Sequence, residues 1–374
     1  MLYILELEPL RERYTFWWRS YIPRQLQKYF NIEIISGESL TDKVETGTVL
    51  DAGSTCYWKS VQLQRICEKF YKKEIEPHSV FFVADIWFPG IEMIRYMSTL
   101  YNIPIYIYGV WHAGSSTRND FAEPMHGWSK EFEIGFLNLC DGVFVGSEYS
   151  RMSIIERLLY SLPDYEIDSL AKRIHAYGMP LNFSDIQQYS SEEKENIVVF
   201  PHRPDPEKNP DVFVNLVRTL DICFNDFGKY KFVFCTSKEK YQSSSSYINN
   251  LIGSLKFDLD NVGIHENLSK EDYYTLIGKS KLVVSTTSEE NFGYCAVEAM
   301  ALGTSVLLPN NFSHPEIVEN QSHYLYNNHD EMIEKAIHLL STEYNYSAEL
   351  KELVKPYEYV IDKWASIMKT GIAQ

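Results

Sequence analysis

The sequence has little of what marks a secreted, zinc-binding or disulfide-rich chain. Its 374 residues include six cysteines, which are scattered and form no C-x-x-C pair. Most of them sit in apolar runs, and we expect those to act as small core residues. The first residues, MLYILELEPLRER, place Glu6, Glu8 and Arg11 where a signal peptide needs an apolar stretch, so we expect a cytoplasmic protein.

Long apolar runs are also missing. The most apolar segment, Ser79–Ile94, is interrupted by Asp85, Pro89, Gly90 and Glu92. A bilayer-spanning helix needs about 20 consecutive apolar residues, so this segment cannot cross a membrane. We expect no stable membrane insertion.

Positive charge is scarce. Lys and Arg number 35 against 51 Asp and Glu, which gives a formal net charge of −16. This balance excludes a surface coated for nucleic acid but leaves room for a local basic site. With 45% hydrophobic and 23% charged residues, the composition is typical of a soluble globular protein, and the length suits two domains.

Short, nearly continuous apolar runs alternate with longer amphipathic stretches in both halves of the chain. Runs such as Val80–Ala84 and Leu282–Ser285 are typical of strands buried on both faces. This alternation predicts an α/β fold with two doubly wound, Rossmann-like domains facing a cleft. The expected segments are a first domain over 1–180, a polar linker over 181–196, a second domain over 197–355, and a helix over 356–374 that could cross back to the first domain.

The most informative stretch is SEENFGYCAVEAMALGTSVLLPN, which begins at Ser288. Glu290 and Glu298 are spaced E-x7-E, a pattern too common to mean anything alone. Here a strand leads through Asn291, Phe292 and Gly293 into a helix. The free amides and the dipole of a helix N-terminus hold phosphate, so both glutamates could face one bound molecule.

A second charged loop follows the first strand of this half, Ile197–Phe200. Its Arg203 and Lys208 would lie at a carboxyl strand end, where ligands of such sheets bind. An Arg fork and a Lys point charge together suit two linked phosphates. The alternative is a solvated charged loop, with Glu298 on a helix surface and Glu290 as a charge favoured by the helix dipole.

These residues together resemble the retaining GT-B glycosyltransferases of the large family-4 type. The resemblance is carried by Arg203, Lys208 and the run SEENFGYCAVEA, and it covers Ile197 to about Tyr326. It implies that Arg203 and Lys208 hold the diphosphate of a UDP- or GDP-linked sugar. It also implies that Glu290 contacts the transferred sugar, that Glu298 binds the ribose, and that the amides of Asn291–Tyr294 lie near the diphosphate.

A narrower resemblance points to the branch that includes the tRNA-queuosine mannosyltransferases. It is carried by FPHR at Phe200, SKEDYY at Ser269, HPE at His314 and YLY at Tyr324. Members of that branch glycosylate a modified nucleoside. The chain departs from them in lacking their N-terminal Gly-Gly-Ser-type loop, since it has Glu8-Pro9-Leu10-Arg11 instead.

The expected chemistry is transfer of a hexosyl or pentosyl group without a cofactor. Arg203, Lys208 and the helix N-terminus would stabilise the leaving diphosphate. We find no Asp-x-Asp motif suited to holding Mg²⁺ there, so we expect no metal. The resemblance implies that the departing phosphate takes the acceptor's proton on the same face, which retains the sugar's configuration.

The first half is expected to bind the acceptor. His112 follows a strong apolar strand and is predicted to be catalytic, because family members often carry a His near the transferred sugar. Asp85 occupies the same edge one unit earlier, although a capping role is an equal alternative. A loop over Arg11–Arg24 interleaves arginines with aromatic residues, which could stack bases and neutralise phosphates, or pack in a core. The candidate acceptor-binding residues are Arg11, Arg13, Trp17, Trp18, Asp85, Trp111 and Arg118.

The acceptor itself stays open between several classes. We prefer a hydroxyl on a modified nucleoside, in tRNA or in hypermodified phage-type DNA, the latter placing the protein in a host cytoplasm. A cell-envelope polysaccharide or lipid acceptor is the alternative, although such enzymes usually show a basic membrane-docking helix. A protein that binds a nucleotide sugar without catalysis is the second class of function.

Overall fold

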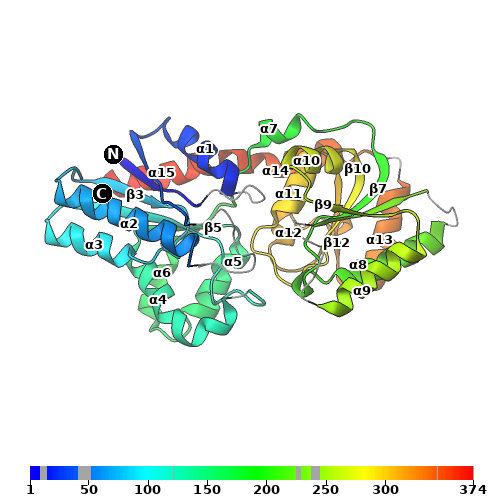
Figure 1. The fold of residues 1–374 in the computed structure, drawn as a ribbon, viewed down its shortest axis with the longest axis horizontal. Helices are drawn as coiled ribbons and strands as arrows, with labels where there is room; N and C mark the ends of the chain where they lie inside the picture. The colour runs from blue at the N-terminus through cyan, green and yellow to red at the C-terminus, as the bar shows by residue number, and fades with distance from the viewer. Residues whose placement is uncertain are drawn as a thin grey trace. The chain divides into compact units, whose positions relative to one another are not determined.

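The computed structural model describes residues 1–8, 15–40, 52–120, 122–224, 229–236, 245–342 and 344–373. Contacts divide the chain into two compact units. The first, unit 1, comprises Met1–Pro180 and Tyr359–Gln374, and the second, unit 2, comprises Leu181–Glu358. Each contains one six-stranded parallel sheet flanked by helices, which confirms the predicted fold class (Figure 1).

The sheet of unit 1 has the strand order β2-β1-β3-β4-β5-β6. Every described residue of β1, β3 and β5 is buried, as expected for strands covered on both faces. Phe81 and Val143, both fully buried, belong to its apolar core. The strands are β1 (Leu2–Leu5), β2 (Ile32–Ile35), β3 (Ser79–Val83), β4 (Ile105–Trp111), β5 (Gly142–Val145) and β6 (Ile174–Ala176).

The helices of unit 1 include one where the sequence predicted a loop. The interleaved Arg and aromatic residues form α1 from Thr15 onward, with Pro23 inside the helix. The loop prediction over Arg11–Arg24 is therefore wrong for this part, because the aromatic residues are spaced to cover the sheet. The helices are α1 (Thr15–Leu26), α2 (Thr55–Tyr71), α3 (Ile91–Leu100), α4 (His126–Leu139), α5 (Glu148–Ser153), α6 (Asp164–Ala171) and α15 (Val360–Ala373).

Helix α15 comes from the far end of the chain and packs in unit 1 beside α1 (Figure 1). Trp364 is fully buried, and its ring stacks on that of Phe144 with centroids 5.0 Å apart. Phe82 and Trp18 lie 5.7 Å and 6.1 Å from it. These rings form a second layer of core between the sheet and the two helices.

The sheet of unit 2 has the strand order β12-β11-β10-β7-β8-β9. Its strands are β7 (Glu195–Phe200), β8 (Lys231–Thr236), β9 (Val262–Glu266), β10 (Ser280–Val284), β11 (Ser305–Pro309) and β12 (Leu325–Tyr326). Its helices are α7 (Phe183–Gln187), α8 (Pro210–Phe224), α9 (Ser246–Asp258), α10 (Lys270–Lys279), α11 (Tyr294–Ala301), α12 (His314–Ile317), α13 (His329–Ser341) and α14 (Ser347–Val354).

This strand order has a switch point between β7 and β10. From β7 the chain proceeds through β8 to β9 on one side, and from β10 through β11 to β12 on the other. The loops that follow β7 and β10 therefore diverge, and the crevice between them is where doubly wound sheets bind ligands.

The segment expected to be a linker, residues 181–196, is packed into unit 2 and contains α7. Lys194 Nζ donates hydrogen bonds to the carbonyls of Gly278 (2.6 Å) and Leu302 (3.1 Å) and to Thr304 Oγ1 (2.9 Å). Lys194, one of the polar residues that suggested a linker, therefore holds this segment to the rest of unit 2. Within the described residues, no helix is long and apolar enough to span a membrane.

Candidate functional site

The loops after β7 and β10 are joined by hydrogen bonds at the switch point of unit 2. Asn209, with a φ of +45°, donates from Nδ2 to the carbonyl of Thr286 at 2.9 Å. Thr286 Oγ1 in turn donates to the carbonyl of Lys208 at 2.7 Å. The Ser288 amide donates to the carbonyl of Glu207 at 2.9 Å. These bonds fix the backbone on both sides of Lys208.

Lys208 and Glu290, both predicted from the sequence, meet in this crevice. Lys208 Nζ lies 3.7 Å from Glu290 Oε2 and 3.4 Å from Thr287 Oγ1. Each of the two charged side chains is 20% exposed. The ammonium is therefore partly desolvated but still open to a ligand, which strengthens its attraction for an anion.

Glu290 also shapes the turn that begins α11. Its Oε1 accepts a hydrogen bond from the Gly293 amide at 3.1 Å. Gly293 has a φ of +83° and precedes the helix, and a Cβ there would lie 3.0 Å from Ile317 Cδ1. Only glycine adopts this backbone without strain. The ring of Phe292 is buried against Tyr294 and Tyr357, so Phe292 offers a ligand its backbone rather than its ring.

Arg203 lies on the β7–α8 loop but is paired within that loop. Its guanidinium lies 3.4 Å from Asp205 Oδ2 and 3.6 Å from Glu207 Oε1, and its side chain is 40% exposed. Exposed pairs of this kind contribute at most about 1 kcal/mol. Arg203 can therefore exchange these partners for an anionic ligand at small cost.

Two buried histidines, His202 and His314, lie near Lys208. His202 pairs through Nε2 with Ser285 Oγ at 2.9 Å. Burial, reinforced by the nearby Lys208, holds the pKa of His202 well below its ordinary value. Burial likewise lowers the pKa of His314 to about 4, although Glu290 opposes the shift. Both rings are therefore neutral at pH 7 and do not compete with Lys208 for an anion.

Glu298, the second glutamate of the E-x7-E pair, is buried on α11. Its Oε1 accepts a hydrogen bond from Tyr274 Oη at 2.8 Å and lies 3.1 Å from Lys270 Nζ. It is thus a buried, paired carboxylate rather than the helix-surface charge that was the alternative.

In unit 1, Asp85 and His112 follow β3 and β4, as expected. Asp85 Oδ2 lies 2.6 Å from the ammonium of the buried Lys59, which also donates to the Trp87 carbonyl. Burial opposes ionisation of Asp85, but Lys59 and His112 outweigh it and lower its pKa. His112 pairs through Nε2 with the Ala84 carbonyl at 2.8 Å, and burial lowers its pKa.

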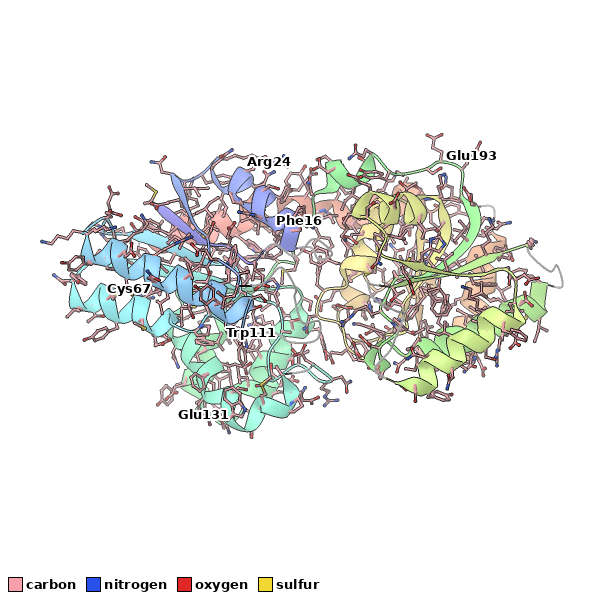
Figure 2. The ribbon with its side chains drawn as sticks, in the orientation of Figure 1. Phe16, Arg24, Cys67, Trp111, Glu131 and Glu193 are labelled. Carbon is pink, nitrogen blue, oxygen red and sulfur yellow. The ribbon has the colours of Figure 1, made fainter. Side chains whose placement is uncertain are left out.

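The structure gives two of the predicted acceptor-binding aromatic residues a packing role. Trp111 and Trp18 are each 2% exposed, Trp111 in the core of the sheet (Figure 2) and Trp18 beside the rings of His112 and Trp364. Neither has the free face that base stacking requires. Trp17 is half-buried and packs edge-on against Tyr21.

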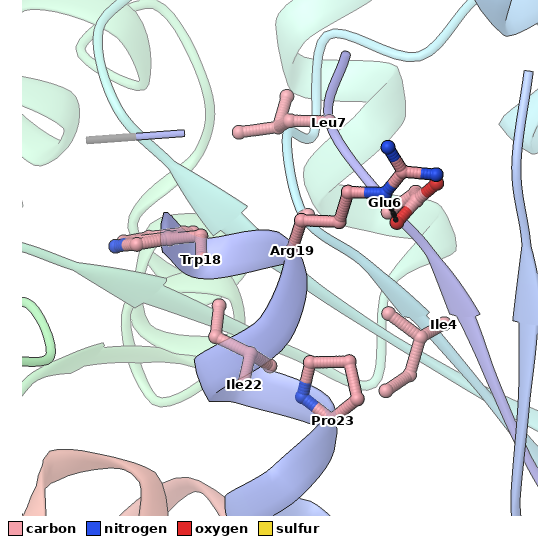
Figure 3. Close-up of a pocket in the computed structure, with 8 residues that line it drawn as sticks. Ile4, Glu6, Leu7, Trp18, Arg19, Ile22 and Pro23 are labelled. Carbon is pink, nitrogen blue, oxygen red and sulfur yellow. Dashed lines mark ion pairs between the residues drawn. The ribbon is translucent and has the colours of Figure 1, made fainter. Parts of the chain in front are cut away.

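The predicted acceptor-binding set also includes three arginines. Arg118 is exposed, and Arg11 and Arg13 lie outside the described residues. On α1, Arg19 Nε lies 3.4 Å from Glu6 Oε2 at the edge of a small, mainly apolar pocket that Trp18 also lines (Figure 3).

One Asp-x-Asp sequence does occur, as Asp258-Leu259-Asp260. It begins at the last residue of α9 and precedes the amino end of β9, whereas Lys208 and Glu290 follow the carboxyl ends of their strands. Among the described residues, no group of three or more His, Cys, Asp or Glu side chains is arranged to hold a metal ion.

Several side chains of these sites were not predicted from the sequence. Thr287 and Lys270 belong to loops and helix starts whose side-chain directions a sequence does not reveal. Lys59 gave a usable signal, because with Gln62 it places polar side chains on the buried face of α2 that also carries Trp58, Ile66 and Phe70.

Comparison with protein families places a domain over most of unit 2. Residues 182–355 match the model described as "Glycosyl transferases group 1". The chain is also 26% identical over 212 residues to the tRNA-queuosine alpha-mannosyltransferase of Drosophila melanogaster. The match covers 52% of this chain and 54% of that protein, so the chain spans about half the length of this relative.

Solved structures resemble both units together. The sucrose-phosphate synthase of Thermosynechococcus elongatus gives a TM-score of 0.63 at 12% identity and covers 99% of this chain and 96% of its own. TarM of S. aureus, solved with UDP, gives 0.59 at 18% identity and covers 82% of this chain and 59% of its own. At these identities the likeness shows the GT-B fold.

Proposed function

We propose that this protein is a retaining glycosyltransferase, because residues 182–355 match the glycosyl transferase group 1 model and the chain has the GT-B fold. It takes a nucleotide sugar as donor and a modified nucleoside of a nucleic acid as preferred acceptor. The observation that carries the proposal is the meeting of Lys208 and Glu290 at the switch point of unit 2.

The donor diphosphate binds between the two loops of that crevice. Lys208 supplies a point charge, Arg203 can give up its loop partners, and the N-terminus of α11 faces the same crevice. The neutral His202 and His314 add no charge, so the attraction comes from few, well-placed cations. Such preorganised groups stabilise negative charge that grows on a leaving group.

The reaction breaks the bond between the anomeric carbon and the diphosphate oxygen and forms a bond from that carbon to the acceptor oxygen. The departing diphosphate keeps the electron pair and accepts the acceptor's proton on the same face of the sugar. Glu290 holds hydroxyls of the transferred sugar, and Glu298 binds the ribose. In this scheme no metal is needed, because Lys208 and Arg203 balance the charge.

Sequence similarity supports the nucleoside acceptor. The relative that acts on tRNA-queuosine is 26% identical over half of this chain. In unit 1, Asp85 and His112 follow two neighbouring strands, and Lys59 of α2 pairs with Asp85; these side chains offer polar groups for an acceptor hydroxyl. The net charge of −16 restricts nucleic-acid binding to a local surface.

The test is transfer of labelled sugar from UDP- and GDP-linked donors to pooled tRNA or to hydroxymethylated DNA. We expect acid-insoluble label that nuclease removes, from one donor and one pool. Release of nucleotide without label in nucleic acid would keep the glycosyltransferase and move the acceptor to saccharides or lipids. Neither label nor release with any donor would favour a non-catalytic protein.

A further inference from the structure

Two donors from α10 converge on one oxygen of the buried Glu298. Tyr274 Oη donates to Glu298 Oε1 at 2.8 Å, and Lys270 Nζ lies 3.1 Å from the same atom. The Lys270 ammonium also lies over the rings of Tyr273 and Tyr274, 5.2 Å and 5.1 Å from their centroids. The direction of this ammonium is therefore constrained by three side chains.

This arrangement gives the buried carboxylate two partners, a phenol and an ammonium. Glu298 is only 2% exposed, and a buried carboxylate without partners is strongly destabilising. Burial and the neighbouring Glu298 raise the pKa of Tyr274, so its phenol keeps its proton and can only donate. Lys270 is 35% exposed and supplies the balancing charge from the solvent side.

The second oxygen of Glu298, Oε2, can still accept hydrogen bonds. Within the described part of the chain, no side chain or amide donates a hydrogen bond to Oε2. An ionised carboxylate accepts about four hydrogen bonds, so an oxygen without donors has room for a ligand's hydroxyls. Two adjacent hydroxyls, as in a ribose, match a carboxylate edge.

We propose that Lys270 and Tyr274 are positioning residues that hold Glu298 with Oε2 turned to the ribose diol. Through Glu298 they set a preference of the donor site for ribonucleotides over 2′-deoxyribonucleotides. This inference rests on the proposed function, in which Glu298 binds the ribose.

The test compares UDP and GDP with their 2′-deoxy counterparts by titration calorimetry on the full chain. The quantity measured is the ratio of the deoxy to the ribo dissociation constant. For the wild type we expect a ratio of roughly 10 or more, because a charged group loses a hydrogen bond with the deoxy ligand. Glu298→Gln brings the ratio close to 1.

The decisive variants act through Glu298. Tyr274→Phe and Lys270→Met lower the ratio at least about threefold, and Lys270→Arg restores most of it. In the double variant Glu298→Gln with Tyr274→Phe, the tyrosine change has no further effect on the ratio, because the two residues act as one unit.

Matched controls come from the same helix. Lys279 pairs with Glu195 at 3.8 Å, away from Glu298, and the hydroxyl of Tyr273 is buried and is not one of the two groups that contact Glu298 Oε1. Lys279→Met and Tyr273→Phe leave the ratio unchanged.

The outcomes separate this inference from the proposed function. If Tyr274→Phe and Lys270→Met lower the melting temperature but keep the wild-type ratio, the two residues merely brace α10 on α11, and the inference is overturned. A wild type without any preference for ribose overturns it too. Failure of the wild type to bind either nucleoside diphosphate overturns the proposed function and, with it, this inference.

Discussion

Lys208 and Glu290 are a pair whose separation, 3.7 Å, is longer than a tight salt bridge. The ammonium of Lys208 also lies 3.4 Å from Thr287 Oγ1, and the side chain is 20% exposed. The protein therefore fixes its position and leaves it able to bind a ligand. A ligand phosphate can join the ammonium without first breaking a strong bond. At the scale of single residues, the site therefore provides a positive charge held in position for a phosphate.

Replacing Lys208 tests that placement. We expect Lys208→Ala to lower kcat/KM for the nucleotide sugar by about a hundredfold or more, because the leaving diphosphate loses a preorganised cation. Steady-state nucleotide release measures this. Lys256→Ala, which removes an exposed lysine on α9, serves as the control and should keep full activity. Equal activity of the two variants would remove Lys208 from the site.

The buried His314 makes stability depend on pH. Its pKa is lowered to about 4 in the folded chain, whereas in the unfolded chain it titrates near 6.5. Its contribution to stability is therefore complete above pH 6.5 and is lost as the pH falls toward 4, by up to about 1.4 kcal/mol per pH unit.

Urea denaturation at pH 7, 6 and 5 checks this dependence. We expect His314→Gln to flatten the fall in unfolding free energy between pH 6.5 and 4. His265→Gln, at an exposed position on β9, should follow the wild-type curve. A wild type and a His314→Gln variant with parallel curves would show that His314 is not held neutral.

At the scale of elements, the turn before α11 depends on one backbone conformation. Gly293→Ala places a Cβ at a φ of +83° and 3.0 Å from Ile317 Cδ1. We expect a loss of about 1–2 kcal/mol in unfolding free energy and weaker nucleotide binding, because the turn carries both Glu290 and the helix N-terminus. Gly253→Ala in α9, where a Cβ meets nothing within 4 Å, should instead stabilise by about 0.5–1 kcal/mol. Chemical denaturation compares the two, and equal effects would contradict a special role for Gly293.

The elements that the sequence predicted well are those whose pattern is local. β3 and β10 overlap the predicted runs Val80–Ala84 and Leu282–Ser285, and the donor loops follow β7 and β10 as expected, because strands covered on both faces give uninterrupted apolar runs. Helix α1 was missed, since Pro23 and its mixed arginines and aromatic residues hide the helical period. The ion pair of Lys59 with Asp85 could not be foreseen, because it joins α2 to a loop 26 residues away through tertiary packing alone.

At the scale of the whole molecule, unit 1 is assembled from two separate parts of the chain. Trp364 of α15 fills the space between Phe144, Phe82 and Trp18, and it is fully buried. We expect Trp364→Ala to lower the free energy of unfolding by about 3–5 kcal/mol, as for other large buried aromatic residues. Tyr359→Ala, which removes a half-exposed ring just before α15, should stay within about 0.5 kcal/mol of the wild type. Denaturant titration measures both, and a small effect at Trp364 would mean that α15 is dispensable for the core.

This interrupted assembly has a consequence for the order of synthesis. All six strands of the first sheet are translated before Leu181–Glu358, and α15 is translated after it. At about 5–20 residues per second, translation of Leu181–Glu358 takes roughly 10–35 s. During that interval, the rings of Phe82 and Phe144 lack the cover that Trp364 provides in the finished chain. The nascent protein therefore carries an open aromatic face for many seconds, and a chaperone that binds such faces has that time to act.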